Sequence, residues 1–386
     1  MMRNYGTPPL ALQRGEGCTV WDVDGSAYLD LIAGIATSSL GHAHPAIAAA
    51  VAEQSQRLVH TSNLVIHEPG LALAERVLGL VGRPGRVFFC QDGATANEAA
   101  LKMTRRHGWQ SDPAGGRLEV VAAEGSFHGR TMGALAVTGN PAKRSPFEPL
   151  PGPVTFVPYG DAAALAAAVT ERTAAVILEP VLGEGGVVVP PEGYLAAARR
   201  ACDDNGALLI LDEVQSGFGR TGSWFAGLGQ GVVPDIMTLA KGFAGGMPLG
   251  AVVGLGSAGD LFAPGDHGST FGGNPVSAAA ALAVIDTIEA DALLDNAQRV
   301  GDAWATAFDE IDQPLLAGHR GVGLWRALQL AAPVAPALEA AARSQGFLVN
   351  AVRPDAVRLA PPLIISEAEA LGFAAALPGL LQEVTP

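Results

Sequence analysis

Residues 207–215, ALLILDEVQ, combine five consecutive apolar residues with an abrupt change to polar ones at Asp212. A short run that is apolar at successive positions predicts a strand with both faces covered, as in a parallel sheet between helices. A carboxylate directly after so apolar a strand is costly to bury unless it has a partner. Asp212 is therefore expected to be a helix N-cap, a metal ligand or the partner of a cationic group on a ligand.

Similar apolar runs alternate with helical segments on both sides of this strand. Expected strands are Arg86–Cys90, Leu118–Ala123, Val154–Pro158, Ala174–Glu179, Ala207–Asp212, Asp235–Ala240 and Leu249–Gly254. The helices between them include Ala94–His107, Asp161–Thr170 and Pro191–Asn205, the last followed by Gly206, a residue typical of helix ends. The alternation predicts an α/β fold whose large domain has a mostly parallel sheet covered by helices.

The rest of the chain predicts a second, smaller unit, because 386 residues exceed the usual size of one hydrophobic core. Residues 1–60 contain strand-like pieces at Thr19–Val23 and Ala27–Leu31 and an Ala-rich helix at Ala46–Val59. After a long helical region from about 274 to 311, strands are expected at Gly321–Leu330 and Leu348–Leu359, and helices at Val334–Ser344 and Glu367–Val384. We expect a large domain at 61–310 and a small α+β domain at 311–386, which the N-terminal segment 1–60 joins.

Composition excludes several classes of protein. A hydrophobic fraction of 49% with 16% charged residues is typical of a globular chain and excludes a disordered or collagen-like one. The net charge of −14, without a basic block, argues against a nucleic acid or an anionic membrane as partner. Cys18, Cys90 and Cys202 are too far apart to indicate a disulfide framework or a zinc site. With no apolar run long enough for a membrane span and no signal-peptide core in the first ten residues, a cytosolic protein is expected.

The chain contains only three lysines, Lys102, Lys143 and Lys241. Lys102 lies in a helix with Arg105 and Lys143 in a Pro-flanked stretch, so both are expected to be exposed. Lys241 ends an apolar strand and precedes Gly242, which directs it to the crevice where open α/β sheets bind ligands. A desolvated amine in such a crevice can form an imine with an aldehyde. Alone, Lys241 fits a salt bridge equally well.

Asp212 and Lys241 together indicate a chemistry that neither residue indicates alone, because neighbouring strands carry them to the same edge of the sheet. A carboxylate that pairs with a protonated pyridine nitrogen maintains the charge that makes pyridoxal phosphate an electron sink. Gln215 is then expected to donate a hydrogen bond to the phenolic oxygen of that cofactor.

A helix N-terminus after the strand Arg86–Cys90 is the expected phosphate site. Gly93 allows a close approach of the backbone, and Thr95 and Glu98 have the spacing of a capping box. Free N–H groups and the helix dipole attract anions at such a position, although many turns of this kind bind nothing. The chain has no Walker motif and no dinucleotide glycine fingerprint, which argues against a nucleotide.

The segment 126–131, SFHGRT, follows the strand Leu118–Ala123. Phe127 can stack on a planar ring, and Arg130 offers a bidentate site for a substrate carboxylate. Taken separately, the two residues also fit a core phenylalanine and a surface arginine, and His128 is expected to be structural. His42 and His44 have no third ligand nearby, so no metal site is expected.

These motifs resemble the class III, pyridoxal-phosphate-dependent aminotransferases, most closely the members that act on N-acetylornithine in bacterial arginine synthesis. The resemblance runs from about Asn4 to the C-terminus. Its markers occur in the family's order: GHAHP at 41–45, HTSN at 60–63, FHGRT at 127–131, LDEVQ at 211–215, LAKG at 239–242 and GSTFGGNP at 268–275. The HTSN segment favours acetylornithine over ornithine or 4-aminobutyrate relatives.

The resemblance implies a fold type I homodimer with active sites at the subunit interface. For the cofactor, it implies that Lys241 forms the imine, that Asp212 pairs with the pyridinium, that Phe127 and Val214 enclose the ring, and that Gln215 lies near the ring oxygen. It further implies that Gly93 and Ala94 bind the phosphate through their amides, and that Thr270 reaches the phosphate of the other subunit.

Substrate-binding roles are implied for Ser269, Arg130, Arg358 and Glu184. Arg130 resembles the arginine that holds a substrate carboxylate, and Arg358 the one that takes the α-carboxylate of glutamate. Glu184 resembles a switch that pairs with Arg358 when the bound amino donor lacks that carboxylate.

The implied reaction moves the terminal amino group of N-acetylornithine to 2-oxoglutarate, giving N-acetylglutamate semialdehyde and glutamate. Alternatives are another ω-aminotransferase, for succinyldiaminopimelate, ornithine or 4-aminobutyrate, and a non-catalytic protein that holds pyridoxal phosphate. One departure from the family pattern is Asp92-Gly93-Ala94-Thr95 in place of Ser-Gly-Thr/Ala-Glu. A carboxylate at that position predicts weaker retention of the cofactor, unless Asp92 turns away to cap the helix.

Overall fold

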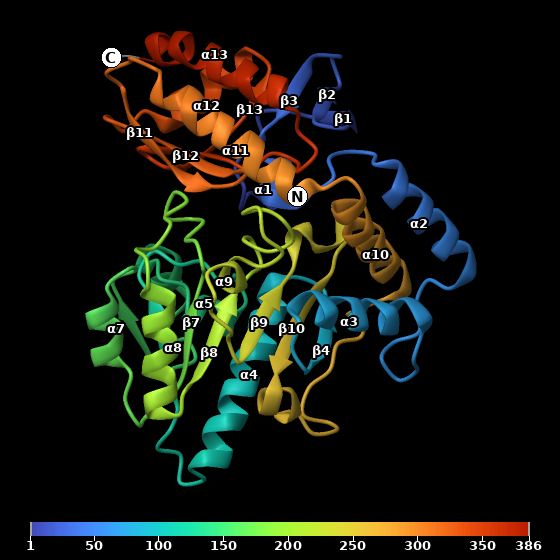
Figure 1. Ribbon diagram of the computed structural model, residues 1–386, viewed down its shortest axis with the longest axis vertical. Coiled ribbons are helices and arrows are strands. Elements are labelled where there is room, and N and C mark those ends of the chain that lie inside the picture. The colour runs from blue at the N-terminus through green and yellow to red at the C-terminus, as the bar shows by residue number, and fades with distance from the viewer. Residues whose placement is uncertain (1, 385–386) are drawn as a thin grey trace.

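The computed structural model describes residues 2–384, whose strands form three sheets (Figure 1). Met1 and residues 385–386, the outermost parts of the expected segment 1–60 and domain 311–386, lie outside the described residues. The largest sheet has the strand order β4 (Gly85–Cys90), β10 (Gly250–Leu255), β9 (Ile236–Leu239), β8 (Leu208–Asp212), β7 (Thr173–Leu178), β5 (Glu119–Ala123) and β6 (Val154–Val157). β10 is antiparallel to both of its neighbours, and the pairs from β9 to β6 are parallel. The predicted α/β fold with a mostly parallel sheet is confirmed.

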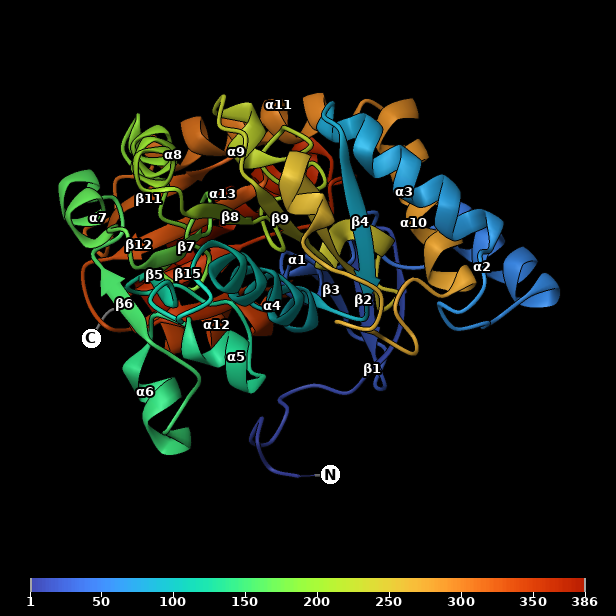
Figure 2. The same cartoon turned by 90° about the horizontal axis from the view of Figure 1, so that it is seen from below.

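Alternate residues of the central strands pack against helices on opposite faces of this sheet. Ala175 and Ile177 of β7 belong to a core with Met103 of α4 (Gly93–Ser111). Val176 and Leu178 belong to a second core with α7 (Ala162–Ala168) and α8 (Tyr194–Asn205). Figure 2 shows α4 and α8 on opposite sides of β7 and β8. Because both faces are covered, the central strands are apolar at successive positions instead of alternating.

Two smaller sheets form the upper part of the molecule in Figure 1. One has the order β11 (Leu316–Val322), β12 (Trp325–Leu330), β15 (Ala356–Leu359) and β14 (Asn350–Arg353). The other has the order β1 (Leu12–Glu16), β2 (Thr19–Asp22), β3 (Ala27–Asp30) and β13 (Phe347–Leu348), with β3 parallel to β13. This shared sheet supports our proposal that segment 1–60 and residues 311–386 form one small domain.

The remaining helices connect or cover these sheets. They are α1 (Ala33–Ala36), α2 (Pro45–Arg57), α3 (Glu68–Val81), α5 (Met132–Ala136), α6 (Pro141–Arg144), α9 (Ala226–Gly229), α10 (Pro275–Ala290), α11 (Leu293–Asp309), α12 (Ala335–Ser344) and α13 (Glu367–Glu383). Short 3₁₀ helices occur at Ser145–Phe147, Lys241–Ala244 and Gly256–Asp260. Across residues 2–384, none of the helices combines the length and the apolar character needed to cross a membrane.

Three predicted elements are wrong in their extent. The single strand expected at Gly321–Leu330 is the hairpin of β11 and β12, which turns at Gly323 with a φ of 56°. The strand expected at Leu348–Leu359 divides into the end of β13 and the hairpin β14–β15, and the helical region 274–311 divides into α10 and α11 at Ala292, whose φ is 50°. Near Gly323 and Ala292 apolar residues flank the break, so hydrophobicity alone does not mark it, whereas β14 and β15 are separated by Pro354 and Asp355, a turn signal that the prediction overlooked. β1 and α3 are among the elements that the sequence analysis did not predict.

Candidate active site

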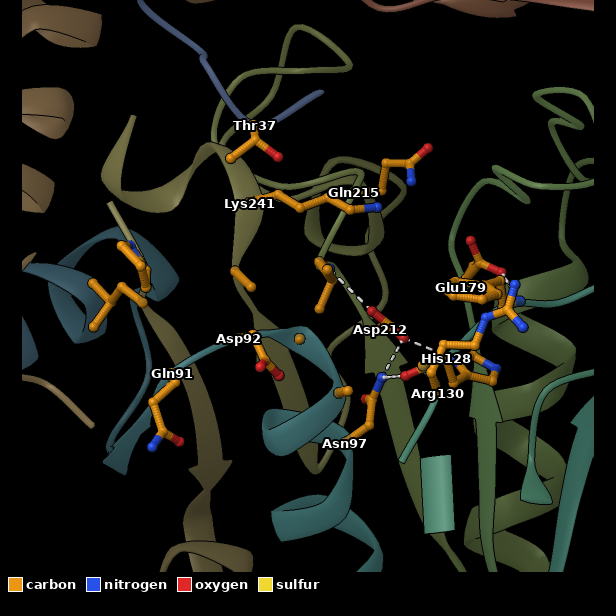
Figure 3. A pocket seen from close by; sticks show the side chains of 18 of the residues that line it. Thr37, Gln91, Asp92, Asn97, His128, Arg130, Glu179, Asp212, Gln215 and Lys241 are labelled. Atoms are coloured by element: carbon orange, nitrogen blue, oxygen red, sulfur yellow. Dashed lines mark hydrogen bonds and ion pairs between the residues drawn. The ribbon is translucent and has the colours of Figure 1, made fainter. Parts of the chain in front are cut away.

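The carboxyl ends of β8 and β9 meet at a cavity of about 450 Å³ (Figure 3). The cavity receives side chains from the ends of three neighbouring strands, from the start of α4 and from the segment after β5. It brings together eight of the residues expected at the site: Gly93, Ala94, Phe127, Arg130, Asp212, Val214, Gln215 and Lys241. The strand-end positions explain this grouping, because parallel strands end at one edge of the sheet.

Asp212 is buried at the edge of this cavity, and its carboxylate has three partners. Oδ2 accepts a hydrogen bond from Nδ2 of Asn97 at 2.8 Å and lies 2.7 Å from Nδ1 of His128, while Oδ1 accepts from the backbone N–H of Val214 at 3.0 Å. Because a carboxylate oxygen only accepts, Nδ1 of His128 carries a hydrogen and donates it to Asp212, while Nε2 is buried with no partner among the described residues. These donors fix an anion at the end of β8, and Asp212 is neither an N-cap nor part of a metal-ligand cluster in residues 2–384.

Sequence reasoning missed Asn97, although its position carries a signal. It lies one turn into α4, on the side of the helix that faces the sheet, and it is 1% exposed. A buried amide needs hydrogen-bond partners, and Asn97 also donates to the backbone oxygen of His128 at 2.6 Å. Asn97 therefore links the helix that carries Gly93 to the carboxylate of Asp212.

Lys241 is the first residue of the 3₁₀ helix after β9, and its φ of 50° lies in the left-handed region that lysine seldom adopts. Such strain is tolerated where the surrounding structure fixes a residue for function. Within residues 2–384, its amine has no hydrogen bond or ion pair, and Figure 3 shows the side chain extending into the cavity. Burial, followed by the nearby charge of Arg358, lowers the pKa of Lys241 to about 8. The amine is thus suited to act as a nucleophile.

We expect the amine of Lys241 in the cofactor-free protein to gain reactivity around pH 8 instead of around its ordinary pKa of 10.5. Because the pKa is lowered, the neutral, nucleophilic form predominates above about pH 8 and the ammonium form below it. Competitive acetylation with acetic anhydride, read by mass spectrometry at a series of pH values, measures this midpoint. Lys102 provides an exposed lysine in the same sample, and a midpoint near 10.5 for Lys241 would contradict the assignment.

Helix α4 begins at Asp92, whose side chain caps it. Oδ1 of Asp92 accepts a hydrogen bond from the backbone N–H of Thr95 at 2.8 Å, and Oγ1 of Thr95 accepts from the backbone N–H of Asp92 at 3.1 Å. The expected capping box of Thr95 with Glu98 is therefore wrong. Glu98 instead accepts from the backbone N–H of Gly133 at 2.8 Å and connects α4 to α5. Asp92, not Thr95, is the N-cap because it lies three residues before the amide that it binds.

Gly93 lies close to Val214, the residue expected on one side of the cofactor ring. A Cβ at position 93 would lie 2.7 Å from Cγ1 of Val214, which no side chain tolerates without a shift. The absence of a side chain at the first helical position thus lets the N-terminus of α4 approach the wall of the cavity. The free amides and the dipole of this 19-residue helix suit a phosphate group.

Asp92 does cap α4, the condition under which a smaller effect on retention is expected, so we expect Asp92→Ser to lower the dissociation constant of pyridoxal phosphate by only about threefold. The capping contact turns one carboxylate oxygen toward Thr95, but the negative charge remains at the helix end that we propose for the dianionic phosphate. Asp92→Asn is the matched control, because it retains an N-cap acceptor and removes only the charge. Equilibrium titration of the cofactor-free protein measures both variants. Unchanged affinity in both would show that Asp92 does not weaken retention.

Arg358 of β15 approaches the cavity from the smaller sheet and is only 3% exposed. Its Nη1 donates to Oε1 of Glu184 at 3.0 Å and to Oε1 of Gln215 at 3.0 Å, and its Nη2 donates to Oδ1 of Asn350 at 2.7 Å. Because Arg358 occupies the amide oxygen of Gln215, the NH₂ group of Gln215 remains available as a donor. Arg130, by contrast, is exposed at the rim, with its guanidinium 5.6 Å from the ring of Phe127.

Lys143 is not the exposed surface residue that the sequence suggested. Its Nζ lies 3.2 Å from Oε2 of Glu184 and 4.8 Å from the centre of the Phe127 ring, and its side chain is 24% exposed. Lys143 lies in the short helix α6, and its contact with Glu184 is one that Pro141 alone does not predict.

Ser269 and Thr270 lie apart from the other expected residues. They line a neighbouring cavity of about 570 Å³, which shares Gln91 with the first cavity but contains neither Asp212 nor Lys241. Asn63 of the HTSN segment donates to the backbone oxygen of Ser269 at 2.9 Å, so two of the quoted motifs contact each other there. A single chain therefore does not bring Thr270 to its own Lys241.

The residues around the first cavity fit pyridoxal phosphate. Asp212 provides a fixed anion for a protonated ring nitrogen, Lys241 a free amine for the aldehyde, Phe127 an aromatic face and Gly93 a close helix N-terminus for the phosphate. An α/β sheet with this set at its carboxyl edge defines an enzyme that uses pyridoxal phosphate.

The family model described as "Aminotransferase class-III" matches residues 1–378, and the chain belongs to this family. Class III aminotransferases depend on pyridoxal phosphate, so the chain is a pyridoxal-phosphate-dependent transaminase that acts on small molecules.

Relatives agree with this family. The chain is 56% identical to a Mycolicibacterium smegmatis protein named acetylornithine aminotransferase, over 99% of this chain and 96% of the relative. Among solved structures, it is similar to the ornithine aminotransferase of Toxoplasma gondii, with a TM-score of 0.95, 31% identity and coverage of 100% and 93%. It is also similar to the N-acetylornithine aminotransferase of Stenotrophomonas maltophilia, with a TM-score of 0.86, 34% identity and coverage of 99% and 98%.

Proposed function

We propose that the chain transfers the terminal amino group of N-acetylornithine to 2-oxoglutarate in arginine biosynthesis, giving N-acetylglutamate semialdehyde and glutamate. The observation that carries this proposal is the pairing of Glu184 with Arg358 at 3.0 Å beside the cavity of Lys241. The name shared by relatives such as those of M. smegmatis and Streptomyces clavuligerus, at 56% and 55% identity, supports the choice of amino donor.

The two substrates place their carboxylates differently, and the pair of arginines suits both. N-acetylornithine reacts at the end far from its α-carboxylate, which Arg130 at the rim binds while Glu184 neutralises Arg358. Glutamate reacts beside its α-carboxylate, which takes Arg358 after Glu184 has moved, and its second carboxylate binds Arg130. One movable carboxylate thereby lets one cavity accept both molecules without leaving Arg358 unpaired and buried.

The chain contributes charge placement and proton transfer. Pyridoxal phosphate, when bound, withdraws electrons from the carbon that carries the amino group. Asn97 and His128 hold the carboxylate of Asp212 in place, where it would keep the ring nitrogen protonated and so favour this electron withdrawal. Nζ of Lys241, with its lowered pKa, takes the proton from the terminal carbon of the donor and acts as general base.

A second subunit is part of the proposal. Thr270 and Ser269 face a neighbouring cavity, and the segment Leu58–Ile66 beside them exposes apolar side chains, of which Leu64 is 92% exposed. Large exposed apolar side chains that gather in one segment are typical of protein interfaces. We propose a cytoplasmic homodimer in which Thr270 of each subunit contacts the phosphate bound by the other.

A panel of amino donors tests the function. Single-turnover reactions of the holoenzyme with N-acetylornithine, N-succinyl-diaminopimelate, ornithine and 4-aminobutyrate, followed by the consumption of the donor, give kcat/KM for each. We expect the highest value for N-acetylornithine. A preference for unacylated ornithine, the substrate in the name of the T. gondii structure, would replace our proposal with that activity.

A further inference from the structure

Glu184 has two cationic partners, one on each carboxylate oxygen. Arg358 donates to Oε1 at 3.0 Å from the buried side, and Lys143 lies 3.2 Å from Oε2 at the more open side, where the side chains of Lys143 and Glu184 are 24% and 26% exposed. Burial raises the pKa of Glu184, but Arg358 and Lys143 together outweigh this effect and lower the pKa overall. Glu184 is therefore an anion at neutral pH that two cations share.

Lys143 is held in place by its own segment. The side chain of Asn140 accepts a hydrogen bond from the backbone N–H of Lys143 at 3.3 Å. The next residue, Arg144, donates to the backbone oxygen of Thr138 and lies 4.0 Å from the ring centre of Phe156. These contacts fix the backbone of Lys143, so its side chain is positioned to contact Glu184.

Breaking the ion pair between Arg358 and Glu184 leaves Glu184 with one cationic partner instead of two. When a ligand carboxylate takes Arg358, Glu184 loses one of its two cations while it is still about three-quarters buried. An unpaired, partly buried carboxylate is unfavourable. Lys143 contacts the other oxygen, so its contact does not depend on the one that breaks.

We propose that Lys143 is a positioning residue that retains Glu184 away from Arg358 while a dicarboxylic substrate is bound, and thereby sets the affinity for that substrate relative to the amino donor. This inference rests on the proposed function, because it deepens the role of the Glu184–Arg358 pair. Lys143 contacts both Oε2 of Glu184, at 3.2 Å, and the face of the Phe127 ring, at 4.8 Å, so it can hold the carboxylate of Glu184 after Oε1 has left Arg358.

The alternative is that Lys143 binds a substrate carboxylate directly, together with Arg130. Both cations lie near the Phe127 ring, at 4.8 Å and 5.6 Å. Lys143, however, already pairs with Glu184, whereas Arg130 has no hydrogen bond or ion pair within the described part of the chain. The two roles differ in which substrate binds more weakly when Lys143 is replaced.

The test uses the holoenzyme and glutarate, a dicarboxylate with neither an amino nor a keto group. In Lys143→Met, we expect the dissociation constant of glutarate, measured by calorimetry, and KM for 2-oxoglutarate to rise by about fivefold to tenfold. KM for N-acetylornithine and kcat should stay within about twofold, since that donor leaves Glu184 on Arg358. The matched variant Lys143→Arg, which retains the cation, should restore glutarate binding.

A second pair of variants shows whether Lys143 acts through Glu184. In a Glu184→Gln background, replacing Lys143 by Met should change glutarate binding by less than about twofold, because the anion is already gone. A rise in KM for N-acetylornithine, or an equal effect of Lys143→Met with and without Glu184, would overturn the inference, as would unchanged glutarate binding. If the wild-type enzyme does not use N-acetylornithine, the proposed function fails, but the glutarate titration still decides the role of Lys143.

Discussion

Lys241→Ala is expected to lower kcat for amino transfer by at least about 1000-fold. The structure offers no substitute for this amine, because Lys102 binds the backbone oxygen of Asp266 away from the cavity and Lys143 pairs with Glu184. The variant loses both the amine that reacts with the cofactor aldehyde and the base at the cavity. Folding should be preserved, since Ala has a Cβ as Lys does and leaves the strain of the φ of 50° unchanged, and since the substitution removes no hydrogen bond.

The covalent link itself can be measured independently of turnover. Borohydride reduction of the holoenzyme followed by peptide mass spectrometry should find the pyridoxyl group on Lys241 in the wild type and on no peptide in Lys241→Ala. Lys102→Ala is the control and should retain the modified peptide and the activity. A pyridoxyl group on Lys143 or Lys102 would refute the assignment of Lys241 and with it the proposed chemistry.

Asp212→Asn is expected to lower kcat/KM by about 100-fold to 1000-fold. The amide cannot supply the negative charge that favours a protonated ring nitrogen. It also places an NH₂ group among donors from Asn97, His128 and Val214, so we expect a loss of about 1 to 3 kcal/mol in the free energy of unfolding.

Glu213→Gln separates the catalytic loss from the loss of stability. Glu213 is the next residue, it is fully buried, and it accepts hydrogen bonds from the backbone N–H groups of Ala226 and Gly227, but it does not line the cavity. Burial raises its pKa to about 7, so the amide changes the charge little, but its NH₂ group faces the two backbone donors and destabilises the fold. Thermal unfolding and steady-state kinetics should show destabilisation in both variants and the large kinetic defect only in Asp212→Asn. Equal defects would assign the role of Asp212 to folding.

The parts of the site that lie at strand ends were predictable from the sequence. Asp212 and Lys241 follow apolar runs, and the order of strands in a covered sheet brings their carboxyl ends together. Contacts that depend on turns between distant elements were not predictable. Lys143 is brought inward by the four residues of α6, and Arg358 meets Gln215 across two sheets. No local pattern of hydrophobicity or charge specifies either approach.

The break between β11 and β12 was also not predictable from the local sequence. Gly323 is one glycine among 49, and nothing in the composition around it separates β11 from β12. Its turn is enforced by packing, since a Cβ there would lie 2.7 Å from the backbone carbon of Thr221. Glycine is therefore required at position 323 because of Thr221, a residue about a hundred positions away in the sequence. The local sequence around Gly323 does not contain this information.

The parallel pairing of β3 with β13 also affects how the molecule is made. The backbone N–H groups of Leu29 and Leu31 bond to the oxygens of Gly346 and Leu348, which leave the ribosome only near the end of synthesis. At ordinary elongation rates the nascent chain carries an unpaired strand edge for on the order of tens of seconds. Strand β3 therefore stays unpaired on this edge, and exposed to chaperones and to aggregation, after β10, the last strand of the large sheet, has been synthesised.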